Sequence, residues 1–175
     1  LGPESYLTGE LLIKNGKAFV SRVTSDTTMN VIKTFNVTAP FFVYGYLNEL
    51  KKTTLPNTIL TIQDLEKYLD EQTKSHRRPF AFSLKGYVKD AQIHVQNLPK
   101  VTKVSSPKEA HKGQVNYTVS NKDVEIIGFF STEHSGVFTH HDSNVHLHLI
   151  TADETMMGHL DSVEFGKMEL LLSKN

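Results

Sequence analysis

The residues best suited to chemistry in this sequence are histidines near its C-terminal end. Six of its nine histidines lie within residues 134–159, where His146 and His148 alternate with apolar residues. Side chains two residues apart in a strand point to the same face, so these two imidazoles should lie side by side. His159 follows the polar turn at residues 152–154, at the distance of a hairpin return. Three neutral imidazoles aimed at one point are a ligand set for zinc or another divalent transition metal.

The same His-x-His alternation also fits a polar pair on the exposed face of an ordinary strand. The third histidine at hairpin distance favours the metal site. Without a metal ion to share, neighbouring imidazoles would repel one another when both are charged. We expect His140 and His141 to be exposed loop residues. The remaining histidines are isolated and should occupy surface or satisfied core positions: His76, His94, His111 and His134.

Composition excludes several classes of protein. Lys+Arg and Asp+Glu are equal at 19 each, so the excess of positive charge that nucleic acids or anionic membranes attract is missing. The longest apolar runs are strand-sized, well short of a membrane helix. Without cysteine, the chain has no disulfides, thiolate nucleophiles or Cys-type zinc sites, and histidines must carry any metal. The start at Leu1 without Met suggests a trimmed chain, soluble and either cytoplasmic or exported, so the sequence leaves its location undetermined.

Short strands must position the histidines. Residues 11–13 and 17–23 flank Asn15-Gly16, a dipeptide that supplies the positive φ of a tight turn, and they predict an opening β-hairpin. Residues 41–47 form an aromatic and β-branched run that predicts a strand buried on both faces.

One helix is clearly indicated. It should begin after Thr61, a good N-cap, and end near Gln72. Its apolar residues Ile62, Leu65 and Leu69 share one face, which predicts packing against a sheet.

The remaining pattern predicts an α+β fold of two small, tightly packed halves. A loop rich in Ser, Pro and Lys at residues 99–108 marks the boundary within one compact unit. Residues 1–100 should form a mixed β-sheet with a helix, and residues 101–175 a β-rich, barrel-like half that carries the metal site. Further strands are expected at residues 80–87, 91–95, 114–119, 124–130, 145–151, 159–165 and 167–172.

With these residues in view, the chain resembles the bacterial alpha-acetolactate decarboxylase family over nearly its whole length. The family's His-Leu-His strand and the Gly-His of a second strand are matched by His146-Leu147-His148 and Gly158-His159 at the same separation. Its opening Gly-Glu hairpin is similar to the stretch that begins Gly9-Glu10-Leu11. Other family segments are similar to residues 80–95, 109–114 and 126–129.

This resemblance implies a metal-dependent carboxy-lyase. It would release carbon dioxide from 2-acetolactate, or a related 2-hydroxy-3-oxo acid, and form acetoin. The implied ligands of Zn²⁺, or another divalent transition metal, are His146, His148 and His159, with Glu10 as acid/base. The small-molecule partner is then an oxyacid, and the family suggests a homodimer built by N-terminal sheets, to which the aromatic run at residues 41–46 could contribute.

Two departures from the family pattern affect the expected chemistry. The family's active-site arginine is matched by Gln96, which is neutral and cannot replace the charge. The family also supplies a carboxylate to the metal from a C-terminal tail, and this sequence, which ends at Asn175, shows no counterpart of it. Arg77, Arg78 or Lys100 could restore a positive charge.

Two alternatives follow. The chain could be a catalytically impaired member of the family that binds a metal and a small oxyacid without turnover, which Gln96 favours. It could also be a cupin-like barrel with an iron site, although Glu154 lies further from the His-x-His, and His159 nearer to it, than that fold requires.

Overall fold

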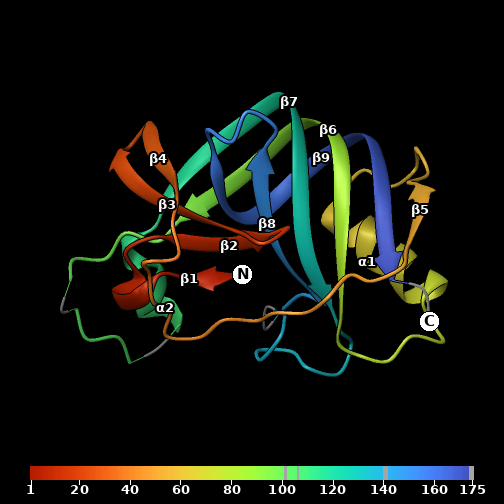
Figure 1. Cartoon of the computed structure of the whole chain (residues 1–175), viewed down its shortest axis with the longest axis horizontal. Helices are drawn as coiled ribbons and strands as arrows, with labels where there is room; N and C mark the ends of the chain where they lie inside the picture. The colour runs from red at the N-terminus through yellow and green to blue at the C-terminus, as the bar shows by residue number, and fades with distance from the viewer. Residues whose placement is uncertain (101, 106, 140–141, 174–175) are drawn as a thin grey trace.

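Two antiparallel sheets and one eleven-residue helix make up most of the fold (Figure 1). The computed structural model describes residues 1–100, 102–105, 107–139 and 142–173. The N-terminal sheet contains β1 (Gly2–Pro3), β2 (Glu10–Lys14), β3 (Lys17–Ser25) and β4 (Thr28–Lys33) in that order. The C-terminal sheet has the order β5-β9-β6-β7-β8, and contains β5 (Leu50–Thr54), β6 (Phe80–Val95), β7 (Val115–Phe130), β8 (Val145–Thr151) and β9 (Met157–Ser173). The helices are α1 (Ile62–Gln72), α2 (Pro107–Ala110) and the 3-10 turns Ser5–Leu7 and His111–Gly113.

The arrangement is consistent with the predicted α+β class, but the sheets are not divided at residue 100. Strands β5 and β6 precede the predicted boundary, and they lie in one sheet with β7, β8 and β9, which follow it. The predicted mixed sheet is wrong, because every pairing between the named strands is antiparallel. Strand β8 pairs with β9 as well as with β7; the barrel-like form of the C-terminal half stays a prediction. No helix in the described part of the chain is long and apolar enough to cross a membrane.

Local signals in the sequence predicted two elements well. The hairpin of β2 and β3 pairs Lys14 with Lys17 around Asn15 and Gly16, whose φ angles are 50° and 71°. Helix α1 has the expected bounds, and Thr61 and Asp64 form a capping box at its N-terminus. Its residues Ile62, Leu65 and Leu69 are buried as predicted.

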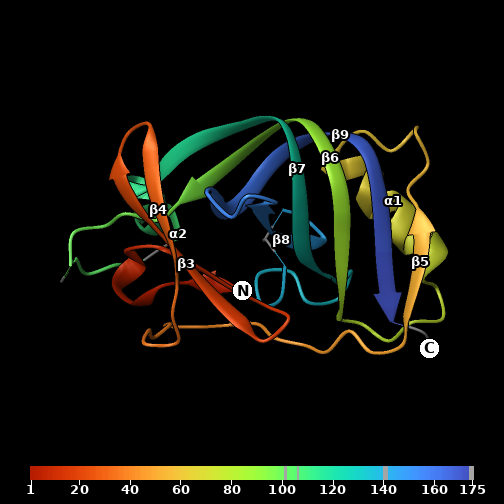
Figure 2. The same cartoon turned by 45° about the horizontal axis from the view of Figure 1, so that its top comes forward.

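Three long strands replace six predicted short ones. Strands β6, β7 and β9 each continue through a polar middle portion, where the sequence suggested a break, and they arch together (Figure 2). The register of β6 against β9 shifts between Gly86 and Asp90, which marks a bend. At the same level, the hydroxyl of Tyr87 donates a hydrogen bond of 2.5 Å to Asn121 Oδ1 of β7. The polar residues therefore lie on an exposed bend of continuous strands.

The strand predicted at residues 41–47 is wrong. The segment has no regular secondary structure and connects the two sheets, with Tyr44 and Tyr46 74% and 80% exposed. Its backbone exchanges hydrogen bonds with Leu1 through Val43, at 2.8 and 3.1 Å. A strand requires a partner for its backbone groups, and apolar composition alone does not supply one.

Two apolar clusters hold the fold together. The larger one lies between helix α1 and the C-terminal sheet and includes Leu65 and Leu69. The smaller one joins the two sheets: Leu12 of β2 and Phe19 of β3 pack with residues of the C-terminal sheet such as Ile150. The N-terminal sheet therefore covers the sheet face that carries Ile150, and with it the alternate residues of β8.

Candidate metal centre

The predicted histidine triad converges on the covered face of the C-terminal sheet. His146 and His148 alternate along β8, and antiparallel pairing places His159 of β9 opposite His148. One ring nitrogen from each of the three residues lies within 4.8 Å of the others. The ring centroids are 5.1 Å apart for His146 and His159 and 5.5 Å apart for His148 and His159. The rings thus surround one common point.

Burial makes His148 a fit donor for a metal ion. Its side chain is fully buried, and neither ring nitrogen has a hydrogen-bond partner among the described residues. Burial lowers the pKa of His148 well below its ordinary value, and the neighbouring His146 acts in the same direction. An imidazole kept neutral is the form that binds a divalent ion. His146 and His159 are only partly buried, so the centre is reached from their side.

The turn between β8 and β9 brings His159 back to His148. Asp153 accepts hydrogen bonds from the hydroxyls of Thr151 and Thr155, at 2.6 and 2.7 Å, and forms an ion pair of 3.0 Å with Lys122 of β7. These interactions, led by the one with Thr151, hold the pKa of Asp153 well below its usual range. The turn is therefore anchored both within itself and to the neighbouring strand.

The structure also brings Glu10 to the triad. Glu10 begins β2, is 3% exposed, and its Oε2 lies 3.6 Å from His148 Nε2. Burial raises the pKa of this carboxyl well above its usual range, while the hydrogen bond from the backbone of Gln96 acts in the opposite direction. A cation held by the imidazoles would also favour the ionised carboxylate. Only the packing of one sheet on the other makes Glu10 and His148 neighbours.

Gln96 lies beside Glu10, directly after the end of β6. Its backbone N–H donates to Glu10 Oε1 over 3.4 Å. The side chain is buried, and its Oε1 has no hydrogen-bond partner among the described residues. The position that the family resemblance assigned to an arginine is therefore adjacent to Glu10, and it carries a neutral side chain here.

Sequence patterns alone did not relate one further residue, His94, to the triad. His94 of β6 was expected to be an isolated surface or core residue, yet its ring stacks on that of His159 with centroids 4.7 Å apart. His94 Nδ1 lies 2.8 and 2.9 Å from the two carboxylate oxygens of Asp161. Strand alternation related His146 to His148, and a short hairpin related both to His159, but neither signal relates β6 to β9.

The remaining histidines, which were predicted at surface, loop or core positions, lie away from the triad or outside the described residues. His76 contacts the carbonyl oxygen of Ser173 at 3.3 Å, and His134 contacts Ser131 Oγ at 2.8 Å. His111 falls in a 3-10 turn, without a described side chain. His140 and His141 lie outside the described residues.

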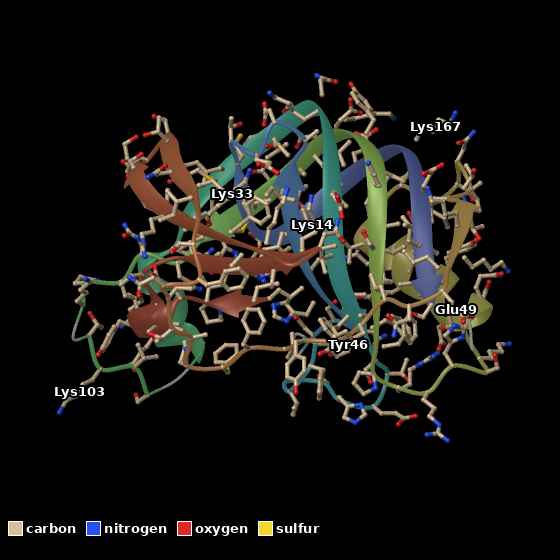
Figure 3. All side chains as sticks on the ribbon, viewed as in Figure 1. Lys14, Lys33, Tyr46, Glu49, Lys103 and Lys167 are labelled. Carbon is tan, nitrogen blue, oxygen red and sulfur yellow. The ribbon has the colours of Figure 1, made fainter. Side chains whose placement is uncertain are left out.

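Three cationic side chains could restore the positive charge that is missing at Gln96, but each of them has other contacts or surroundings. Arg78 donates to the carbonyl oxygen of Thr73 at 2.8 Å, and its guanidinium lies over Phe130. Arg77 lines an open cavity of about 630 Å³, which includes none of the three triad histidines. Lys100 is exposed. The cavity lined by Arg77 can be located by Tyr46, which also lines it and is labelled in Figure 3.

Comparisons with known proteins identify the family of the chain and solved structures that share its fold. The family model described as alpha-acetolactate decarboxylase matches residues 1–174. An alpha-acetolactate decarboxylase of Brevibacillus brevis is 28% identical over 139 residues, which are 79% of this chain and 47% of that protein. The chain therefore spans about half the length of this relative.

Two solved structures show the same fold. The crystal structure of alpha-acetolactate decarboxylase from Bacillus subtilis strain 168 has a TM-score of 0.75 at 23% identity, covering 99% of this chain and 72% of that one. A Staphylococcus aureus protein of unknown function, similar to alpha-acetolactate decarboxylase, has a TM-score of 0.73 at 15% identity, covering 97% and 70%.

Proposed function

Because the chain belongs to the alpha-acetolactate decarboxylase family, we propose that it catalyses the metal-dependent decarboxylation of 2-acetolactate, or of a related 2-hydroxy-3-oxo acid, to acetoin or its homologue. The observation that carries this proposal is the convergence of His146, His148 and His159 beside the buried carboxyl of Glu10. The proposed ligands are the three imidazoles, and the proposed metal is zinc or another divalent transition ion.

The residues around the triad have separable tasks in this reaction. A divalent ion bound there would polarise the substrate's carbonyl group and stabilise the negative charge left when carbon dioxide departs. The electron pair of the broken carbon–carbon bond must then take up a proton on carbon. Glu10, whose Oε2 is 3.6 Å from His148, is the carboxyl placed to hold and deliver that proton. The N-terminal sheet covers this face and limits the access of water.

Gln96 bears on the rate of the proposed reaction. Its buried amide offers a dipole at the position where the family resemblance implies a guanidinium. We therefore propose slow turnover. The second candidate function, binding of a metal and an oxyacid without turnover, is favoured by this one residue.

We also propose that the chain forms a homodimer. The exposed aromatic side chains of Phe41, Tyr44 and Tyr46 support this proposal, because burial within one chain does not explain them.

The proposed metal centre predicts one divalent ion per chain. In the His146→Ala/His148→Ala double variant, two of three ligands are lost, so we expect bound zinc to fall from about one equivalent to almost none after dialysis. Elemental analysis and the folded fraction by circular dichroism would be measured on both proteins. The matched control is His76→Ala, which removes an imidazole away from the triad. Equal zinc in wild type and the double variant would refute the proposed centre.

A further inference from the structure

A fourth imidazole lies against the proposed ligands. His94 of β6 is the register partner of His159 of β9, and the planes of the two stacked rings differ by 26°. The side chain of His94 is 5% exposed. The torsion that orients an imidazole ring is intrinsically broad, so the direction of a ligand nitrogen depends on what the ring packs against. For one face of His159, that contact is the ring of His94.

The backbone is built for this close contact. A Cβ atom at Gly158 would lie 2.5 Å from the carbonyl oxygen of His94, which real side chains do not tolerate. The residue before His159 must therefore be glycine if β9 is to approach β6 this closely.

A β-bulge directs Asp161 at His94. Gln92 pairs with Ser162 and Ile93 pairs with Leu160. Asp161 is therefore an extra residue of β9, without a residue opposite it in the strand register of β6. Bulges of this kind re-aim a side chain, and they are frequent beside active sites.

The carboxylate of Asp161 holds the His94 ring in one orientation. Both of its oxygens lie within hydrogen-bond distance of His94 Nδ1, at 2.8 and 2.9 Å. Nδ1–H therefore donates to the carboxylate, which fixes the position of the proton on the ring and opposes its rotation. A carboxylate that holds an imidazole is a common outer-shell device in metal sites, where it usually acts on the ligand itself. Here it acts on the ring stacked against a ligand.

We infer that Asp161 and His94 are positioning residues of the metal centre: Asp161 holds the ring of His94, and this ring sets the plane in which His159 presents its nitrogen to the triad. The inference rests on the proposed metal site, since it assigns an orienting pair to one of the proposed ligands. It predicts that either residue can change metal affinity and ligand geometry without being a ligand.

Cobalt binding to the full chain tests this pair without depending on turnover. Co²⁺ would be titrated into wild type, Asp161→Ala, Asp161→Asn and His94→Phe, with the dissociation constant and the visible absorption spectrum as readouts. We expect Asp161→Ala and His94→Phe to bind Co²⁺ about tenfold or more weakly, with altered visible bands. Asp161→Asn retains an acceptor for Nδ1–H and should recover much of the affinity. Glu164→Gln, which removes an exposed carboxylate on the same strand, is the matched control and should behave as wild type.

The outcomes separate this inference from the proposed function. If folded Asp161→Ala and His94→Phe bind Co²⁺ with the affinity and spectrum of wild type, the positioning role is wrong although the metal centre stands. If wild type itself does not bind Co²⁺, the metal centre fails and the positioning role fails with it. Thermal unfolding followed by circular dichroism shows whether each variant is folded. Asp161 has a 38% exposed side chain, so its variants remain informative if His94→Phe does not fold.

Discussion

Glu10 and Gln96 show how much of the proposed chemistry depends on single side chains. Both are buried, and they contact one another through the Gln96 N–H and Glu10 Oε1. Glu10 can ionise or hold a proton that it can transfer, whereas the neutral amide of Gln96 can do neither. The proposed centre therefore contains a carboxyl that can hold a proton, but Gln96 supplies it with no cation to stabilise charge that would develop on the substrate.

Restoring the cation should raise the rate. The loss of one preorganised donor costs about 3 kcal/mol of transition-state stabilisation in other active sites, or about a hundredfold in rate. We expect weak acetoin formation from racemic acetolactate by wild type with zinc supplied, and faster formation by Gln96→Arg. Gln72→Arg, at the exposed end of helix α1, adds the same charge away from the centre and should not change the rate.

The Gln96→Arg experiment also tests Glu10. Adding Glu10→Gln should abolish the gain, because an amide cannot deliver the proton. Vigorous turnover by wild type would contradict the proposed effect of Gln96. If no variant turns over acetolactate despite bound zinc, the chain binds its oxyacid without catalysis.

At the scale of elements, the turn between β8 and β9 decides whether the triad forms. The pairing of His148 with His159 requires the strands to meet in one register, and a slip of one residue would turn a histidine to the opposite face. Asp153 stabilises the turn that sets this register through its hydrogen bonds and its ion pair with Lys122.

The contribution of Asp153 to stability should depend on pH. Its pKa is depressed in the folded chain, chiefly by the hydroxyl of Thr151. A depressed pKa stabilises the fold above the unfolded value of about 4, and this stabilisation is lost as the pH falls towards the folded value. Asp153→Asn should therefore be less stable than wild type at pH 7, and the difference should shrink by pH 3.

Urea unfolding at several pH values would measure this difference. Asp26→Asn, in the exposed turn between β3 and β4, controls for the loss of any surface carboxylate. A gap between wild type and Asp153→Asn that is the same at pH 7 and pH 3 would show that the charge of Asp153 does not stabilise the turn.

At the scale of the whole molecule, the two sheets together build the proposed centre, whereas the aromatic side chains of the segment between them are largely exposed. The C-terminal sheet carries the histidines, and the N-terminal sheet covers them and contributes Glu10. The connecting segment at residues 41–47 adds little to either apolar cluster apart from Val43. Its exposed aromatic side chains are therefore available to a second copy of the chain.

The proposed homodimer predicts a change in mass when this segment is made polar. Sedimentation equilibrium should give twice the chain mass for wild type and a shift towards the single-chain mass for Tyr44→Ser/Tyr46→Ser, because the variant loses two exposed aromatic contacts. Val137→Ser removes another exposed apolar side chain and should leave the mass unchanged. A monomeric wild type at micromolar concentration, or a double variant that remains dimeric, would contradict this assignment.

Local signals in the sequence were sufficient for several elements. The Asn15-Gly16 hairpin, helix α1 and strand β8 each depend on residues that are neighbours along the chain, through a turn, a cap or an alternation of side chains. The triad was predictable for the same reason, since a short hairpin joins its members. The family pattern pointed to Glu10 and Gln96, which local spacing would not have related to the histidines.

Only the tertiary structure decided the rest. The polar middles of β6, β7 and β9 indicated breaks, but long-range pairing carries the strands through bends. The apolar run at residues 41–47 predicts a buried strand, yet within the described part of the chain it forms no strand, and its backbone hydrogen bonds are those between Val43 and Leu1. His94 and Asp161 meet because β9 bulges against β6, and Glu10 reaches His148 because one sheet packs on another. Contacts between residues far apart in the chain depend on which surfaces pack together, and no local periodicity encodes that choice.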